Sequence, residues 1–319
     1  MNPPRFVSES EMRALVGPAE LRRLMRQTLA QRAAGEAASP PRFAYGSDSA
    51  RVGVMPVASG GAPGTPLGLK VVGLNPGAGH AGLYLRFDPV SGELTHLFDG
   101  GALTALRTAA VSAAVTEALV PPREIRSVAI FGAGRQAVEH LRAFRALVPG
   151  VLVRVYARSP ESALRLRAQL APRDLEFVEF SAGPLRAPVS ADVICLATNA
   201  ATPVLDSADL RRARHINAIG SCRPDRREVG GALVAACARY VDSLPQAHRE
   251  AGDLLLARAE RTLRGPLAVE IGELLREGGR VADGRTTFFK SLGLACEDAA
   301  YAELLVRKLA SGAAKERAA

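Results

Sequence analysis

The strongest constraint on the fold of this chain is a glycine-rich turn that joins an apolar strand to a helix. The apolar segment 127–131 runs into Gly132 and Gly134, and Ala137 falls in the first turn of a helix expected to end near Leu147. This GxGxxA spacing between a strand and a helix predicts a dinucleotide site rather than a purely structural glycine turn. Gly132 would permit the tight turn, Gly134 would admit a pyrophosphate close to the backbone, and Ala137 would let the helix pack against the strand.

The strand after this helix favours a phosphorylated cofactor. Sites for NAD usually end this strand with Asp or Glu, which binds the ribose hydroxyls. Here the strand ends Tyr156-Ala157-Arg158-Ser159, without an acid. Arg158 can pair with a 2′-phosphate and Ser159 can hydrogen-bond to it, so the sequence predicts NADP(H) as the preferred cofactor and NAD(H) as the alternative. The other interpretation of Arg158 is a solvated surface cation.

The spacing of strands and helices after Pro121-Pro122 is typical of a parallel, doubly wound sheet. The residues before this junction follow a different pattern. Helical periodicity predicts a helix across the first 35 residues, the segment 41–98 has the pattern of short strands that end in a hairpin, and Asp99 is expected to cap a helix that ends before Pro121. The junction at Pro121-Pro122 is therefore the expected domain boundary.

Composition and charge exclude several classes of protein. The chain has 319 residues and a formal net charge of +9, but its basic residues are mixed with acids, and aromatic residues make up only 5%. This pattern disfavours a nucleic-acid partner. No apolar run is long enough to span a membrane. Four cysteines without CxxC spacing favour a reducing, cytoplasmic location, and we expect no membrane partner.

The histidines give no sign of a metal site. None of the five has the spacing of a metal-ligand set, so the sequence predicts no bound metal. His80 is expected in a surface loop, and the loop 59–64 is expected to form part of a pocket wall. Lys290, near the end of the parallel-sheet region, is expected to be structural.

Lysine usage singles out one candidate active-site residue. Only four of the 41 basic residues are Lys, and Lys70 is one of two that lie in apolar surroundings. Arg107 falls within the apolar stripe of the helix that follows Asp99. A buried guanidinium needs an anion, which is either a structural partner such as Glu117 or Asp99, or a substrate carboxylate held in a bidentate fork. Arg42 is a third candidate cation.

Five stretches of the chain resemble the ornithine cyclodeaminase/mu-crystallin family, in order and over nearly the whole length. They are GLKVVGLNP, LTALRTAAVSAAVT, IFGAGRQAVEH, INAIGSCRPDRREV and FKSLGLACEDAAYAELL. The resemblance implies an α/β fold in which a Rossmann domain with a doubly wound parallel sheet, residues 120–289, is inserted in an α+β substrate-binding and dimerisation domain, residues 1–119 plus 290–319. It also implies a homodimer.

The resemblance further implies roles for individual residues. Arg42, Lys70 and Arg107 would bind the carboxylate of a small amino-acid or imino-acid substrate. Independently of the resemblance, Thr198 lies at the carboxyl end of an expected strand, where such sheets bind ligands, and would contact the cofactor or only cap the next helix. The complete predicted set of cofactor-binding residues is Gly132, Gly134, Arg135, Gln136, Ala137, Arg158, Ser159, Thr198, Gly220 and Leu292.

Two departures point to the ketimine-reductase branch of this family. In its cyclodeaminases the stretch after the fifth strand resembles GGDCPGKxE, with a catalytic Asp at the position that Cys222 occupies here, whereas RPDxRE is similar to the ketimine-reductase and mu-crystallin branch. The cyclodeaminases also place an Asp where this chain has Arg158-Ser159. The resemblance therefore implies NAD(P)H-dependent reduction of an imine next to a carboxylate, such as 1-pyrroline-2-carboxylate or 1-piperideine-2-carboxylate, or related amino-acid dehydrogenase chemistry.

This reading gives two residues a catalytic role. Lys70 would donate a proton, directly or through water, as hydride reaches the imine carbon. Asp225 would orient Lys70 or a water, recognise the substrate nitrogen, or serve only as a turn residue. Two other functions stay open: an ornithine-type cyclodeaminase with tightly bound NAD that releases ammonia, and a non-catalytic protein that binds NADPH or another small ligand.

Overall fold

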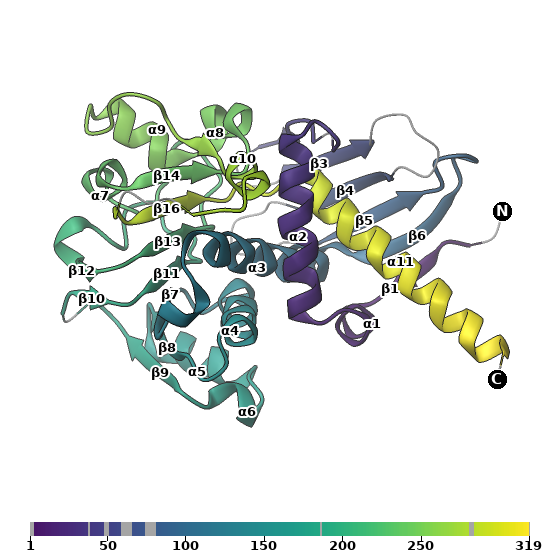
Figure 1. The fold of residues 1–319 in the computed structure, drawn as a ribbon, viewed down its shortest axis with the longest axis horizontal. Coiled ribbons are helices and arrows are strands. Elements are labelled where there is room, and N and C mark those ends of the chain that lie inside the picture. The colour runs from purple at the N-terminus through teal and green to yellow at the C-terminus, as the bar shows by residue number, and fades with distance from the viewer. Residues whose placement is uncertain are drawn as a thin grey trace. The chain divides into compact units, whose positions relative to one another are not determined.

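The chain divides into two compact units, and its fold is drawn in Figure 1. The computed structural model describes residues 3–37, 39–47, 51–58, 66–73, 81–185, 187–280 and 284–318, with side chains up to residue 312. The first unit comprises Met1–Arg107 and Gly293–Ala319, and the second comprises Thr108–Leu292. The loop 59–64 and His80 lie outside the described residues.

The first unit contains a six-stranded sheet with the strand order β1-β6-β5-β4-β3-β2. Only β1 and β6 pair in parallel, while the other neighbours are antiparallel. Helix α11 (Ala295–Ala318) lies against β3, β4 and β5, and helices α1 (Glu9–Leu15) and α2 (Pro18–Ala33) pack on α11. The strands are β1 (Arg5–Val7), β2 (Phe43–Gly46), β3 (Arg51–Ala58), β4 (Leu67–Gly73), β5 (Gly82–Phe87) and β6 (Leu94–Asp99).

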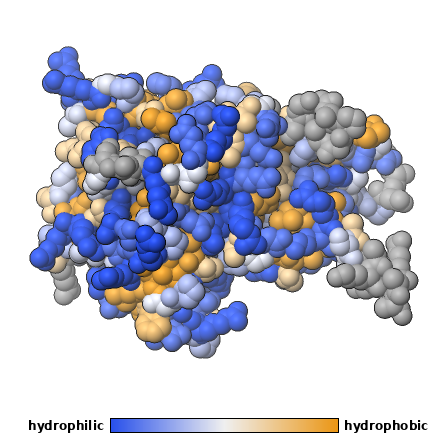
Figure 2. All heavy atoms as spheres, in the orientation of Figure 1, coloured by the Kyte–Doolittle hydropathy of each residue, from blue (hydrophilic) through white to orange (hydrophobic). Residues whose placement is uncertain are grey.

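The prediction of a helix across the first 35 residues is wrong in part. Residues 5–7 form the edge strand β1, and the helical region is split in two. Ser8 begins α1 with a capping box to Glu11, and Gly17 adopts an extended backbone before Pro18 opens α2. Figure 2 shows that the outward side of α2 is hydrophilic, in keeping with an amphipathic helix whose apolar residues are buried.

The opposite face of the six-stranded sheet is apolar and is not buried. Residues that are direct partners across the strands share a face, and one such set is apolar on all six strands apart from Asp99 at the end of β6. We call this set the open sheet face: Phe6, Phe43, Tyr45, Val52, Val54, Pro56, Ala58, Leu67, Leu69, Val71, Leu83, Leu85, Phe87 and Leu97. None of these side chains is in the core, and Tyr45 is 73% exposed.

The second unit contains an eight-stranded parallel sheet with the order β15-β14-β16-β13-β11-β7-β8-β9, which confirms the predicted α/β class (Figure 1). The chain reverses its direction of winding between β7 and β11, where doubly wound sheets bind their ligands. The strands are β7 (Ser127–Phe131), β8 (Leu152–Ala157), β9 (Val178–Ala182), β11 (Val193–Leu196), β13 (His215–Ala218), β14 (Ala238–Val241), β15 (Val269–Glu270) and β16 (Thr287–Lys290). A separate pair is formed by β10 (Val189–Ser190) and β12 (Leu210–Arg212).

Helices follow most strands of this sheet. They are α4 (Arg135–Leu147), α5 (Pro160–Ala168), α6 (Pro172–Leu175), α7 (Gly231–Ala236), α8 (Leu244–Glu250), α9 (Gly252–Ala259) and α10 (Ile271–Arg276). The predicted strand–turn–helix from residue 127 to Leu147 is confirmed at both ends.

Helix α3 (Gly100–Leu119) contains the point where the two units divide. Asp99 caps it as predicted, since its Oδ1 accepts from the Ala102 N–H at 2.9 Å. The second half of α3 is held within the second unit, because Ser112 bonds to the His140 ring at 2.9 Å and Thr116 bonds to Asn217 at 3.0 Å. The structure therefore divides inside this helix, whereas the sequence pattern placed the boundary at Pro121-Pro122 and the family resemblance placed it after residue 119.

Candidate active site

A cluster of buried charges lies between the sheet and the last helix of the first unit. Lys70 on β4 and Arg107 on α3 share the Asp298 carboxylate of α11, with the Lys70 Nζ at 2.6 Å and the Arg107 Nε at 3.0 Å. Each of the two cations is 3% exposed, and Asp298 is fully buried. The structure thus brings together two of the predicted substrate-binding residues.

The third predicted cation, Arg42, joins the same cluster through Gly293. Its Nη2 donates to the Gly293 carbonyl at 3.4 Å, and its charge lowers the pKa of Lys70. Gly293 has a φ of +77°, and a Cβ there would lie 2.8 Å from Arg107 Nη2. A glycine is therefore required where the backbone meets the Arg107 guanidinium.

The anions of the cluster differ from those that the sequence suggested. Arg107 Nη1 contacts Glu297 at 2.6 Å, and Glu297 also accepts from the Leu294 N–H at 3.2 Å. The structural partners of Arg107 are therefore Glu297 and Asp298 rather than Glu117 or Asp99. Their sequence separation from Arg107 is about 190 residues, so no local pattern could have paired them.

Burial and charge set the protonation of this cluster. Burial lowers the pKa of Lys70 to about 8, although Asp298 opposes the shift. Burial disfavours the Asp298 carboxylate, but Arg107 and Lys70 outweigh that effect and hold its pKa below the ordinary value. Three cations, Arg42, Lys70 and Arg107, are thus gathered near the buried carboxylates of Glu297 and Asp298. Such an arrangement is suited to a single bound carboxylate, with Lys70 able to give up a proton near neutral pH.

The glycine turn of the second unit has the features that a dinucleotide requires. Gly132 has a φ of +117°, and a Cβ there would collide with the Ala197 carbonyl oxygen, so the loops after β7 and β11 meet at this position. A Cβ at Gly134 would meet no other atom, which leaves open space before the first turn of α4. The N–H groups of that turn have no side-chain cap from Gly134, and such groups attract phosphate oxygens.

The remaining residues of the turn lie as the spacing predicts. Ala137 is fully buried against the strand. Arg135 begins α4 and is exposed, while Gln136 is half-buried. The Gln136 Oε1 atom is buried and has no hydrogen-bond partner within the described part of the chain. A fitting group for this turn is therefore a phosphate, bound by backbone N–H groups with a polar side chain beside it.

The end of β8 carries the residues that we predicted to select the cofactor. Arg158 is exposed and forms no ion pair with any described residue. Ser159 is the N-cap of α5 and accepts from the Ser162 N–H at 3.3 Å, and a hydrogen bond with Ser159 lowers the pKa of Glu161. The Ser159 hydroxyl is thus engaged within its own helix turn.

Thr198 and Gly220, at the carboxyl ends of β11 and β13, are joined by a residue that sequence reasoning missed. The Glu228 carboxylate is fully buried and accepts from the Thr198 N–H at 2.7 Å, from its hydroxyl at 2.8 Å and from the Gly220 N–H at 2.7 Å. Leu292, also predicted to contact the cofactor, is buried, and its N–H donates to Asp242 at 2.6 Å. The Thr198 hydroxyl also accepts from the Ala200 N–H, at 3.2 Å.

A family model covers almost the whole chain. The model of the ornithine cyclodeaminase/mu-crystallin family matches residues 5–313. The chain belongs to this family.

Its relatives include ketimine and pyrroline-carboxylate reductases. The chain is 37% identical to the ketimine reductase mu-crystallin of Macropus fuliginosus, over 82% of this chain and 81% of the relative. It is 29% identical to a Δ1-pyrroline-2-carboxylate reductase of Bacillus cereus, over 98% of each. The structure is similar to that of the Thermococcus litoralis Δ1-pyrroline-2-carboxylate reductase in complex with NADH and L-proline, with a TM-score of 0.88, 26% identity, and 97% of this chain and 98% of that chain covered.

The stretch that we expect to distinguish the branches of this family contains Cys222 and Asp225. Cys222 occupies the position of the cyclodeaminase Asp, and its Sγ lies 3.8 Å from the carbonyl oxygens of Ser291 and Leu292. Asp225 is exposed, and its carboxylate forms an ion pair with Arg223 at 3.0 Å, which lowers the Asp225 pKa. This contact favours the turn role for Asp225 among those considered.

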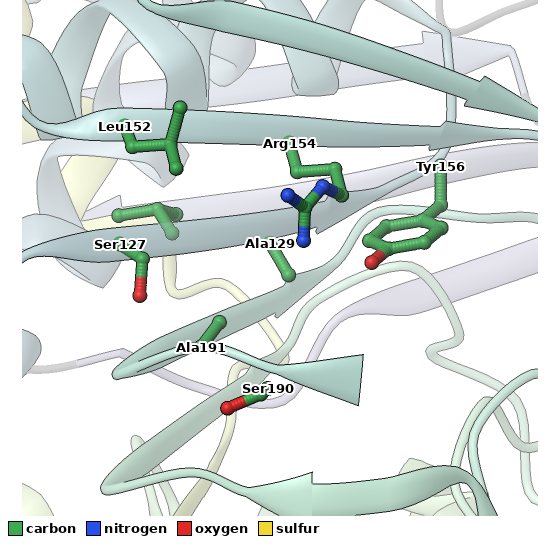
Figure 3. A pocket seen from close by; sticks show the side chains of 8 residues that line it. Ser127, Ala129, Leu152, Arg154, Tyr156, Ser190 and Ala191 are labelled. Atoms are coloured by element: carbon green, nitrogen blue, oxygen red, sulfur yellow. The ribbon is translucent and has the colours of Figure 1, made fainter. Parts of the chain in front are cut away.

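A hollow of about 200 Å³ lies on one face of the second sheet, over β7 and β8 (Figure 3). Arg154 and Tyr156 border it beside Ser127 and Ser190. Its lining includes neither the glycine turn nor Arg158, and Arg154 is paired with Glu179. We therefore do not count it as part of the candidate site.

The described residues lack two further features, a metal-ligand cluster and a membrane-spanning helix. They contain no group of three or more His, Cys, Asp or Glu side chains placed to hold a metal ion. Nor does any of their helices combine the length and hydropathy that crossing a membrane requires.

Proposed function

We propose that this family member is an NAD(P)H-dependent oxidoreductase that reduces an imine next to a carboxylate, such as a cyclic ketimine. The observation that carries the proposal is the buried cluster of Lys70, Arg107 and Asp298, in which a guanidinium lies beside a lysine of lowered pKa. The names of two of its relatives, a ketimine reductase and a Δ1-pyrroline-2-carboxylate reductase, refer to substrates of this class. A five- or six-membered ring imine with a neighbouring carboxylate is therefore the first substrate to test.

The residues of the first unit would position and protonate the substrate. Arg107 and Arg42 would bind the carboxylate, since their guanidinium groups are suited to a planar anion. Lys70 would hold its proton at Nζ and donate it to the imine nitrogen. The nicotinamide cofactor, when bound, supplies the hydride. Gly132, Gly134 and the first turn of α4, with Arg135 and Gln136, would hold its pyrophosphate.

An assay of the purified protein tests this proposal. The protein is mixed with 1-pyrroline-2-carboxylate or 1-piperideine-2-carboxylate and either NADPH or NADH, and absorbance of the reduced nicotinamide is followed. We expect consumption of the cofactor and formation of the saturated ring amino acid. Release of ammonia from ornithine without net cofactor consumption would instead identify a cyclodeaminase. Binding of NADPH without turnover of any imine or of keto acid with amine would identify a binding protein.

We also propose that NADP(H) is the preferred cofactor, with Arg158 as the residue that selects it. Replacing Arg158 with alanine should weaken NADPH binding roughly 10–100-fold, because a charge-assisted contact of about 1.5–3 kcal/mol is lost. NADH affinity should stay within a factor of about two, since NADH has no 2′-phosphate. Nicotinamide fluorescence titration measures both affinities. Arg165→Ala, which removes an exposed arginine from α5, is the control, and equal loss for both cofactors would refute the role of Arg158.

A homodimer is proposed from the open sheet face. It presents fourteen apolar side chains over six strands, an area that a stable monomer rarely leaves in water. Light scattering should therefore give a mass twice 33.5 kDa. Replacing the half-buried Leu85 at the centre of this face with glutamate should shift the mass to that of one chain, since the carboxylate would be buried without a partner. Val90→Glu, in the exposed hairpin turn, should leave the mass unchanged. A light-scattering mass of one chain for the wild-type protein would show that the homodimer proposal is wrong.

A cytoplasmic location is the last part of the proposal. The four cysteines are free, and three of them are buried. Free thiols of this kind persist in a reducing compartment.

A further inference from the structure

Glu228 is the buried carboxylate on which the carboxyl edge of the second sheet depends. Its Oε1 accepts from both donors of Thr198, and its Oε2 accepts from the Gly220 N–H. These residues follow two adjacent parallel strands, β11 and β13, next to the point where the winding reverses. One side chain thus fixes the spacing of the two strand ends.

The two strand ends approach each other closely at Gly220. A Cβ at Gly220 would collide with the Thr198 carbonyl oxygen and with Glu228 itself. Any side chain at position 220 would therefore displace Thr198 or Glu228. The three donors also have the geometry of charge-assisted hydrogen bonds, which are strongest with an ionised acceptor.

A second layer of charges holds Glu228 in place. The Asp253 Oδ1 atom on α9 accepts from the Glu228 N–H at 2.7 Å and from the Val229 N–H at 3.0 Å. The other Asp253 oxygen lies 3.0 Å from the Nζ of Lys290 on β16, and both side chains are fully buried. Lys290, expected to be structural, therefore anchors the backbone from which Glu228 projects.

We propose that Glu228 is a positioning residue for the nicotinamide cofactor, and that the carboxylate form binds Thr198 and Gly220 in the arrangement that accepts the cofactor. The inference rests on the proposed function, in which the cofactor occupies the carboxyl edge of this sheet. A protonated Glu228 is a neutral acceptor, so its hydrogen bonds from Thr198 and Gly220 are no longer charge-assisted and are weaker. The two strand ends are then held together less firmly.

The surroundings of Glu228 place the protonation of its carboxylate near neutral pH. Burial raises the pKa of Glu228 to about 7, with Lys290 opposing the shift and Asp253 adding to it. Cys195 on β11 also faces the carboxylate, but burial and Glu228 raise its pKa well above the ordinary value, so it stays neutral. Lys290 stays charged, because Asp253, Cys222 and Glu228 overcome its burial and raise its pKa.

The test is a titration of the intact protein with NADH between pH 6 and pH 8, followed by nicotinamide fluorescence. NADH is chosen because it lacks the 2′-phosphate, which titrates in the same range. If only the carboxylate form binds, the Kd for NADH should be roughly tenfold higher at pH 6 than its value at pH 8, with a midpoint near 7. Glu228→Gln should bind NADH weakly and without this pH dependence. Glu260→Gln, an exposed glutamate paired with Arg227, should keep the wild-type profile.

A second variant keeps the test decisive if Glu228→Gln does not fold. Thr198→Val removes the hydroxyl donor but keeps the backbone N–H. The hydrogen bond from this hydroxyl lowers the pKa of Glu228 in the wild type. The midpoint of the NADH profile should therefore move to higher pH, which a purely structural role would not produce. A flat wild-type profile, or an unmoved midpoint in Thr198→Val, overturns the inference. Absence of NADH and NADPH binding at every pH would instead overturn the proposed function together with it.

Discussion

Replacing Lys70 with methionine is expected to lower kcat on the order of 10²–10⁴-fold, the usual contribution of a positioned proton donor. Methionine fills a similar volume in the buried slot, so the loss reflects the missing ammonium rather than a cavity. Steady-state kinetics with a cyclic imine and saturating NADPH measure the effect. In the wild type, activity should fall as pH rises above about 8, because the proton donor is then lost.

The matched control for this variant is Lys308→Met. Lys308 also pairs with a carboxylate, Glu20 at 2.9 Å, but both side chains are more than a third exposed. We expect wild-type kinetics and no change in the basic limb of the pH profile. Unchanged turnover in Lys70→Met, with circular dichroism like that of the wild type, would remove Lys70 from the mechanism.

Replacing Arg107 with methionine should lower the free energy of unfolding by about 3–5 kcal/mol, because two buried carboxylates lose a cation. Those carboxylates are Glu297 and Asp298, and neither is exposed. The KM for the imine should also rise, since the substrate carboxylate loses its guanidinium partner. Urea denaturation measures the first effect and substrate titration the second.

Two further variants separate charge from geometry. Arg107→Lys keeps the charge but loses the fork, and we expect an intermediate loss of stability with a raised KM. Arg86→Met removes a half-buried arginine that pairs with Glu303 of the same last helix at 2.8 Å. It should cost only about 1–2 kcal/mol and leave KM unchanged. An Arg107→Met protein with wild-type stability and KM would contradict both claims for Arg107.

The sequence predicted the second unit well because its signals are local. The glycine turn, the alternation of strands and helices, and the cap at Asp99 each depend on neighbouring residues, and each has the predicted form. The three cations of the first unit were also predicted, two from their apolar surroundings and all three from family resemblance.

The sequence could not predict which side chains form ion pairs and hydrogen bonds with these residues. Glu297 and Asp298 reach Arg107 only through the packing of α11 on the first sheet, and Glu228 reaches Thr198 across thirty residues. The signal that could have found the first pair is two adjacent acids within an otherwise apolar start of a helix. The break at Gly17 was missed because the apolar periodicity continues on both sides of it.

The position of Asp298 near the end of the chain bears on the order of events during synthesis. Lys70 and Arg107 leave the ribosome long before the carboxylates that neutralise them, and the 185 residues of Thr108–Leu292 are made in between. The second unit is one uninterrupted segment and can fold as soon as it emerges. Until α11 has been synthesised, Lys70 and Arg107 of the first unit have no carboxylate partners. A nascent chain halted before residue 297 should therefore keep an incompletely folded first unit, which chaperones or proteases can recognise.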